Sequence, residues 1–160
     1  MNDDASRQAA RYPQVGDLAP DFELEGSDGR FRLSEQRGRR VVLFFYPGDN
    51  HLICTRQFCS YRDRVDEFDD LDVRAFGISP QSVASHQSFI DEHALTVPLL
   101  ADTEFVASRA YGVYSRLIGT KRGTFVIDRA GVTRYRHDNV LSLTYDTVER
   151  LKNALTGLDA

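Results

Sequence analysis

Residues 41–59 read VVLFFYPGDNHLICTRQFC and carry the strongest structural signal of the chain. The run from Val41 to Tyr46 is continuously β-branched, aliphatic or aromatic, which is typical of a central strand buried on both faces. Pro47 and Gly48 then end the strand. Apolar residues next recur at the spacing of one helix face, namely at Cys54, Phe58, Tyr61, Val65 and Phe68. The stretch therefore predicts a strand, a turn and a helix that carries Cys54 in its first turn.

The sequence before this stretch predicts a β-hairpin. Residues 22–24 and 31–33 flank Asp28-Gly29, a dipeptide that favours tight hairpin turns. Residues 1–14 are polar, so we expect a flexible segment there and a single domain over residues 15–160.

The sequence after this stretch alternates strand and helix signals. Residues 73–78 predict a strand, followed by Ser79 as the N-cap of a helix and Pro80 as its first residue. We expect that helix to end near residue 92 or 94. Residues 97–100 predict a short strand, and Pro98 favours a position for it toward the edge of the sheet.

The remaining elements are a short helix, a second hairpin and a terminal helix. The short helix is expected over residues 105–111, and the hairpin over residues 124–128 and 132–137. The terminal helix is marked by Val148, Leu151 and Leu155 and closed by Gly157. Strand–helix alternation implies right-handed crossovers. The predicted class is α/β, with a mixed central sheet, helices on both faces and an N-terminal hairpin.

Composition excludes several function classes. The 160 residues are 41% apolar and 28% charged, which is typical of a globular domain. The net charge of −4 argues against nucleic acid as the main partner. No apolar run is long enough to span a membrane. We expect no secretory signal and a cytoplasmic location, where two cysteines favour chemistry or core packing over a structural disulfide.

The two cysteines admit more than one interpretation. Cys54, in the first turn of a helix, meets free N–H groups and the positive end of the helix dipole, so we expect its pKa to fall. Cys59 follows five residues later, on the polar face with Arg62 and Asp66, and about 7 Å or more separates the two Cα atoms. The pair forms a disulfide only if the helix unwinds. The alternative is that Cys54 is a small core hydrophobe and Cys59 an incidental exposed thiol.

Several motifs together resemble the peroxiredoxins, in particular the bacterioferritin-comigratory-protein (PrxQ) group. The resemblance covers nearly all of residues 15–155. The matching segments are residues 15–22 (VGDLAPDF), 28–29 (DG), 33–34 (LS), 44–47 (FFYP) with Cys54 seven residues on, Cys59, 62–63 (RD) and 122–128 (RGTFVID). Each motif alone is weak, but the combination is specific. The resemblance implies a thioredoxin-like fold.

The resemblance also implies an activity and a role for each site residue. Cys54 would reduce hydrogen peroxide or an alkyl hydroperoxide and become a sulfenic acid. Cys59 would resolve it as an intramolecular disulfide, and thioredoxin or a similar thiol reductant would reset the pair. Arg122 would stabilise the thiolate and the transition state, and Pro47 would shape the pocket. No cofactor is implied, and a monomer or weak homodimer is expected.

The sequence departs from the family pattern directly before Cys54. His51 stands where the family usually has threonine, and Leu52-Ile53 replaces the usual Pro-Gly. His51 is either a participant in the site or a solvated loop histidine. A second hypothesis follows, in which the protein is a catalytically weakened redox sensor or a chaperone-like binding protein on the same fold.

Metal binding is the weakest hypothesis. His51, Cys54 and Cys59 would need a fourth ligand that the sequence does not offer. His86 and His93 lie seven residues apart on one helix face but lack further ligands. We therefore assign no metal.

Overall fold

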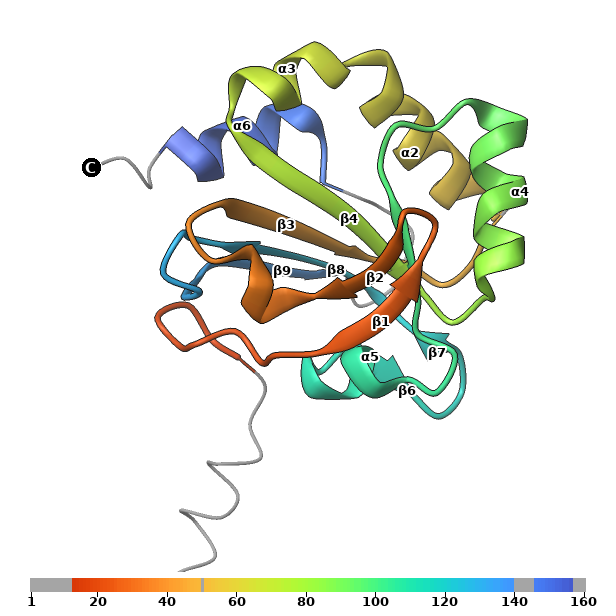
Figure 1. Cartoon of the computed structure of the whole chain (residues 1–160), viewed down its shortest axis with the longest axis horizontal. Helices are drawn as coiled ribbons and strands as arrows, with labels where there is room; N and C mark the ends of the chain where they lie inside the picture. Colours follow the sequence, from red (N-terminus) through yellow and green to blue (C-terminus); the bar gives the residue numbers. More distant parts are fainter. Residues whose placement is uncertain (1–12, 50, 140–145, 157–160) are drawn as a thin grey trace, which may run out of the picture.

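The computed structural model describes residues 13–49, 51–139 and 146–156. Its elements follow the chain as β1 (Glu23–Gly26), β2 (Gly29–Arg32), the 3-10 helix η1 (Leu33–Gln36), β3 (Arg40–Phe45), α2 (Leu52–Asp63), α3 (Val65–Asp70), β4 (Val73–Ser79), α4 (Val83–His93), β5 (Leu99–Ala101), α5 (Val106–Ala110), β6 (Tyr114–Ser115), β7 (Gly119–Thr120), β8 (Arg122–Ile127), β9 (Thr133–Asn139) and α6 (Val148–Thr156). Seven strands form one sheet in the order β2-β1-β5-β4-β3-β8-β9 (Figure 1).

β3 is the buried central strand that the sequence predicts. All six of its residues are buried. It pairs in parallel with β4 on one side and antiparallel with β8 on the other. Because its side chains alternate between the two faces of the sheet, β3 contributes to two separate apolar cores.

The two faces of the sheet carry different layers. α2, α3, α4 and α6 cover one face, where Val42 and Phe44 of β3 pack. The N-terminal hairpin and α5 contribute to the opposite core, with Leu43 and Phe45. The mixed α/β class, the flanking helices and the N-terminal hairpin are confirmed.

Gly77 allows α2 to lie close against the sheet. A Cβ atom at this position of β4 would come within 2.8 Å of the Phe58 ring on α2 and 2.7 Å of Leu99 on β5. Such contacts are too short for real Cβ atoms, so glycine lets the helix that carries Cys54 pack directly on the strands.

Two helix boundaries differ from the prediction. The apolar spacing from Cys54 to Phe68 predicts one helix, but the chain breaks at Arg64 into α2 and α3. The helix after β4 is capped by Ser82, whose hydroxyl accepts from the N–H of Ser85, and not by Ser79. Ser79 instead ends β4 in the core and donates its hydroxyl to Gln81. Apolar spacing defines a buried face, but it does not show where a helix is interrupted.

β5 is not an edge strand, and that prediction is wrong. It pairs in parallel with β4 and antiparallel with β1. Pro98 lies just before the strand, so it removes no hydrogen bond from the ladder. The hairpin β1–β2 covers the outer side of β5.

The terminal helix and the second hairpin are confirmed within the described residues. Gly157, the predicted end of α6, lies outside them, as do residues 1–12 of the segment expected to be flexible. Of that segment, Pro13 is buried and its carbonyl accepts from Arg136 at 2.8 Å. Among the described helices, none is long and apolar enough to cross a membrane.

Candidate active site

Reactive side chains meet where β3 ends and where α2 and β8 begin. The antiparallel register pairs Phe45 of β3 with Gly123 of β8, so Arg122 lies beside the end of β3. α2 begins at Leu52, which puts Cys54 in its first turn as predicted. Two segments far apart in the sequence thereby bring Cys54 and Arg122 together.

Cys54 is fully buried, and two donors face its sulfur. Nη2 of Arg122 donates to Sγ at 2.6 Å, and only 2% of Arg122 is exposed. The backbone N–H of Gly48, in the turn after β3, donates to the sulfur as well. Both donors favour the thiolate over the thiol.

The expected fall in the pKa of Cys54 is nevertheless wrong. Burial raises the pKa of the Cys54 thiol above its ordinary value, because an anion loses its hydration in the core. The charge of Arg122 and the Gly48 N–H lower the pKa, but they do not outweigh burial. The helix terminus favours the thiolate, but the loss of solvent around the buried sulfur has the larger effect on its pKa.

Gln57 belongs to the site and was missed from the sequence. It is buried on α2, and its side-chain oxygen accepts from Nη1 of Arg122 at 2.5 Å. Its amide donates to the hydroxyl of Tyr61 at 3.0 Å, and Tyr61 donates to the carbonyl of Asp146 at 2.6 Å. Gln57 follows Cys54 by three residues, so both lie on one helix face. A polar residue on an otherwise apolar face was the available signal.

Cys59 lies on α2 but not on a fully solvated face. It is half-buried and packs against the core that contains Cys54 and Phe58. The expected polar companion Asp66 is in α3, beyond the break at Arg64. Both cysteines are free thiols.

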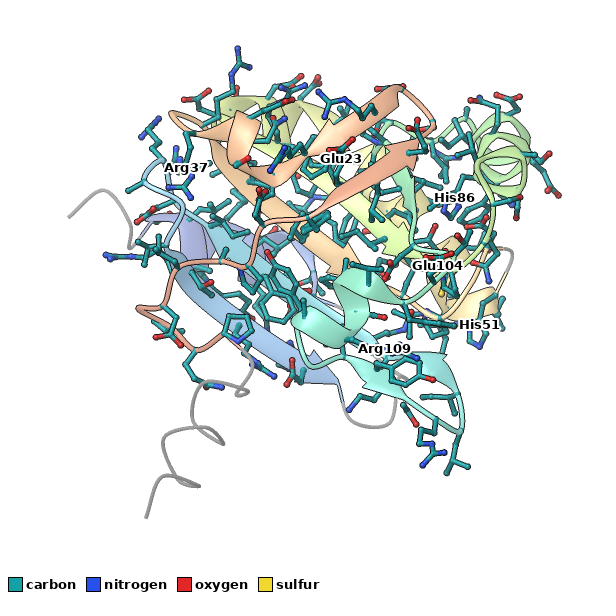
Figure 2. The ribbon with its side chains drawn as sticks, turned by 60° about the horizontal axis from the view of Figure 1, so that its bottom comes forward. Glu23, Arg37, His51, His86, Glu104 and Arg109 are labelled. Atoms are coloured by element: carbon teal, nitrogen blue, oxygen red, sulfur yellow. The ribbon has the colours of Figure 1, made fainter. Side chains whose placement is uncertain are left out.

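The two residues predicted to support the site lie before α2. Pro47 is half-buried and directly precedes Gly48. His51 is the N-cap residue of α2, and its side chain makes no capping hydrogen bond. It is exposed at the margin of the molecule (Figure 2). This arrangement agrees better with a solvated loop histidine than with a donor to the sulfur.

Comparisons with known proteins agree with this geometry. A family model described as the AhpC/TSA family matches residues 15–136. Peroxiredoxin Bcp of Bacillus subtilis is 33% identical over 150 residues, which cover 88% of this chain and 96% of the relative. The chain belongs to the AhpC/TSA peroxiredoxins. It is therefore a thiol peroxidase.

Further proteins similar to this peroxiredoxin are named peroxiredoxin Q, PrxQ or BcpB. Chloroplastic peroxiredoxin Q of Oryza sativa subsp. japonica is 39% identical over 127 residues, covering 78% of this chain and 58% of the relative. The solved structure of BcpB from Mycobacterium tuberculosis has a TM-score of 0.80 at 30% identity and covers 92% of this chain and 97% of that one. A cysteine-to-serine variant of PrxQ from Xylella fastidiosa gives a TM-score of 0.84, covering 94% and 99%, and at 24% identity supports the thioredoxin-like fold alone.

The described residues of this peroxiredoxin hold no metal-ligand cluster. Within residues 13–49, 51–139 and 146–156, no group of three His, Cys, Asp or Glu side chains could hold a metal ion. His86 is buried against Asp49, and the ring of His93 packs edge-on against Phe89.

Proposed function

We propose that Cys54 is the peroxidatic cysteine and Cys59 the resolving cysteine of a peroxidase that thioredoxin or a similar thiol reductant recycles. The substrate is hydrogen peroxide or an alkyl hydroperoxide. Arg122 is the electrostatic catalyst, Pro47 shapes the pocket, and His51 borders it. We propose that the protein works in the cytoplasm, as a monomer or weak homodimer.

In the first step the Cys54 thiolate attacks one oxygen of the peroxide. An S–O bond forms while the O–O bond breaks, so the sulfur is oxidised to sulfenic acid and the peroxide is reduced. The leaving oxygen takes up the proton that the thiol released and departs as water or alcohol. A buried guanidinium suits this step because it stays charged and can donate to the sulfur and to a peroxide oxygen.

In the second step Cys59 attacks the sulfur of the sulfenic acid. An S–S bond forms and hydroxide leaves as water, which yields an intramolecular disulfide. The two cysteines are five residues apart on a helix, so the first turns of α2 must unwind for this step. Two thiols of the reductant then return both cysteines to thiols and leave with a disulfide of their own.

The observation that carries the proposal is the 2.6 Å contact between Nη2 of Arg122 and Sγ of Cys54. Desolvating a guanidinium costs several kcal/mol, and its contact with the sulfur favours a thiolate over a neutral core thiol. The contact supports a sulfur that carries charge at some point of its cycle.

Mass spectrometry of the thiols before and after one equivalent of peroxide tests the proposal. We expect two free thiols to become one intramolecular disulfide. Cys54→Ser should abolish turnover, and Cys59→Ser should allow over-oxidation of Cys54. If both thiols stay titratable under excess peroxide, the proposal is wrong.

A redox sensor remains the second candidate, and two observations favour it. His51 makes no capping bond beside Cys54, and burial disfavours the thiolate. A sensor would be oxidised stoichiometrically without turnover supported by reductant. Replacing His51→Thr distinguishes the two: a large gain in peroxide rate supports a weakened enzyme, and a loss assigns the histidine a positive role.

A further inference from the structure

A buried ion pair lies under the turn that precedes Cys54, and the peroxidase mechanism leaves it unused. Nδ1 of His86 on α4 lies 2.8 Å from Oδ2 of Asp49 in the turn. The side chain of His86 is 0% exposed and that of Asp49 is 2% exposed. His86 projects from α4 toward the strands (Figure 2).

The partners of the ring fix the protonation state of His86. Nε2 lies 2.9 Å from the carbonyl oxygen of Leu100, which only accepts hydrogen bonds. Nδ1 faces the carboxylate of Asp49, whose pKa is lowered; burial opposes this, but hydrogen bonds from His86 and Tyr46 prevail. Two acceptors that face the two ring nitrogens favour hydrogen on both, which is the positively charged form of the ring.

The carboxylate ties the turn to elements on either side of it. Asp49 accepts from the hydroxyl of Tyr46 at 2.7 Å and from that of Ser85 at 2.7 Å. Its own N–H donates to the side-chain oxygen of Gln81 at 3.1 Å. These bonds join the end of β3, the turn and the start of α4, so they anchor Asp49 between these elements.

The ion pair also bears on the charge of Cys54. The titratable groups that face it are Tyr46 from the end of β3 and Cys54 from α2. The negative charge of Asp49 raises the pKa of Cys54, since two anions repel in the core. The adjacent imidazolium offsets that repulsion.

We propose that Asp49 and His86 together set the charge environment of Cys54: the imidazolium cancels a carboxylate charge that would otherwise disfavour the thiolate. The proposal rests on Cys54 being the peroxidatic cysteine. Replacing His86 and replacing Asp49 should shift the titration of Cys54 in opposite directions, whereas a role of the pair in stability alone predicts no such opposition.

The experiment measures thiolate formation by Cys54 against pH, by ultraviolet absorbance and by alkylation with iodoacetamide. All variants carry Cys59→Ser, so that a single thiol is titrated. His86→Gln removes the positive charge and should move the titration to higher pH by about one unit, slowing alkylation at neutral pH about tenfold. Asp49→Asn removes the negative charge and should move the titration of Cys54 to lower pH. The double variant should return close to the parent.

The matched control is His93→Gln, which lies on the same helix and should leave the titration unchanged. Shifts of both single variants in one direction, or of neither, would overturn the proposal. If His86→Gln does not fold, the isosteric Asp49→Asn decides alone, because an upward shift or none contradicts us. Alkylation needs no peroxide, so a parent protein that alkylates normally but ignores peroxide refutes the proposed function instead.

Discussion

The guanidinium of Arg122 is buried and donates to two partners, the sulfur of Cys54 and the side-chain oxygen of Gln57. Arg122→Gln keeps a polar side chain but removes the charge. We expect the peroxide rate to fall about 10²- to 10³-fold, as for the loss of one transition-state donor. Stopped-flow oxidation of the reduced protein measures it. Lys121→Gln removes a neighbouring cation and should change the peroxide rate little. If the two variants lose the same factor in rate, Arg122 is not the specific electrostatic catalyst.

The raised pKa of Cys54 predicts the pH dependence of the reaction. A thiol with a raised pKa releases its proton at higher pH, so the thiolate fraction at neutrality is smaller than for a free cysteine. The oxidation rate should therefore keep rising as the pH passes about 8.5, the ordinary value for cysteine. A pH–rate profile with Cys59→Ser measures it. A plateau already reached below neutrality would contradict the direction that burial gives.

At this scale the sequence predicted which residues meet, but not their electrostatics. The motifs around Cys54 and Arg122 identified both side chains, which the structure brings into contact. The sign of the pKa shift depends on burial, which spacing along the chain does not report. Asp49 and His86 meet only after folding, since they lie 37 positions apart.

At the scale of elements, α2 is held by the hydroxyl of Tyr61. The hydroxyl accepts from Gln57 and donates to the carbonyl of Asp146. Tyr61→Phe removes the hydroxyl, so the side-chain amide of Gln57 and the carbonyl of Asp146 each lose this hydrogen bond. The free energy of unfolding should fall by about 1–3 kcal/mol. Because α2 unwinds in the proposed second step to bring the cysteines together, disulfide formation after oxidation should become faster.

Urea denaturation and rapid acid quench measure these two effects. Tyr135→Phe is the matched control, since that hydroxyl also bonds Asp146 but comes from β9 and not from α2. It should cost stability without speeding the disulfide step. If both variants accelerate disulfide formation equally, the hydroxyl of Tyr61 does not specifically stabilise α2.

The types of the longer elements followed from the sequence, but their boundaries and neighbours did not. The run 41–46 is apolar throughout, and a strand of that kind is buried whatever flanks it. The break at Arg64 and the interior position of β5 depend on contacts with distant segments. Proline favours an edge only when it lies inside the strand, and Pro98 lies before it.

At the scale of the whole molecule, ion pairs join α3 to α6. Glu67 accepts from Lys152 at 3.1 Å and pairs with Arg64, which also pairs with Glu149. Hydrogen bonds from Arg64 and then Lys152 lower the pKa of Glu67 from 4.5 to about 2. These side chains are partly exposed, so salt screens the pairs.

The lowered pKa of Glu67 gives a signed prediction for acid. The contribution of this carboxylate to stability is present above its unfolded value of 4.5 and is lost as the pH falls toward about 2. The difference in free energy of unfolding between the parent protein and Glu67→Gln should therefore become smaller as the pH falls from 4.5 to about 2. Urea midpoints at several pH values measure it, with Asp63→Asn as a surface control. A difference independent of pH would contradict the assignment.

The strand order also has a consequence for synthesis. Glu25 of β1 pairs with Ala101 of β5, so the hairpin meets its neighbour only after the chain between them exists. At a ribosomal speed of about 5–20 residues per second, that interval is about 4–15 s. Throughout it the nascent hairpin presents an unpaired backbone edge to other chains. Such an edge is a template for pairing with another chain, so aggregation during synthesis is the expected hazard of this strand order.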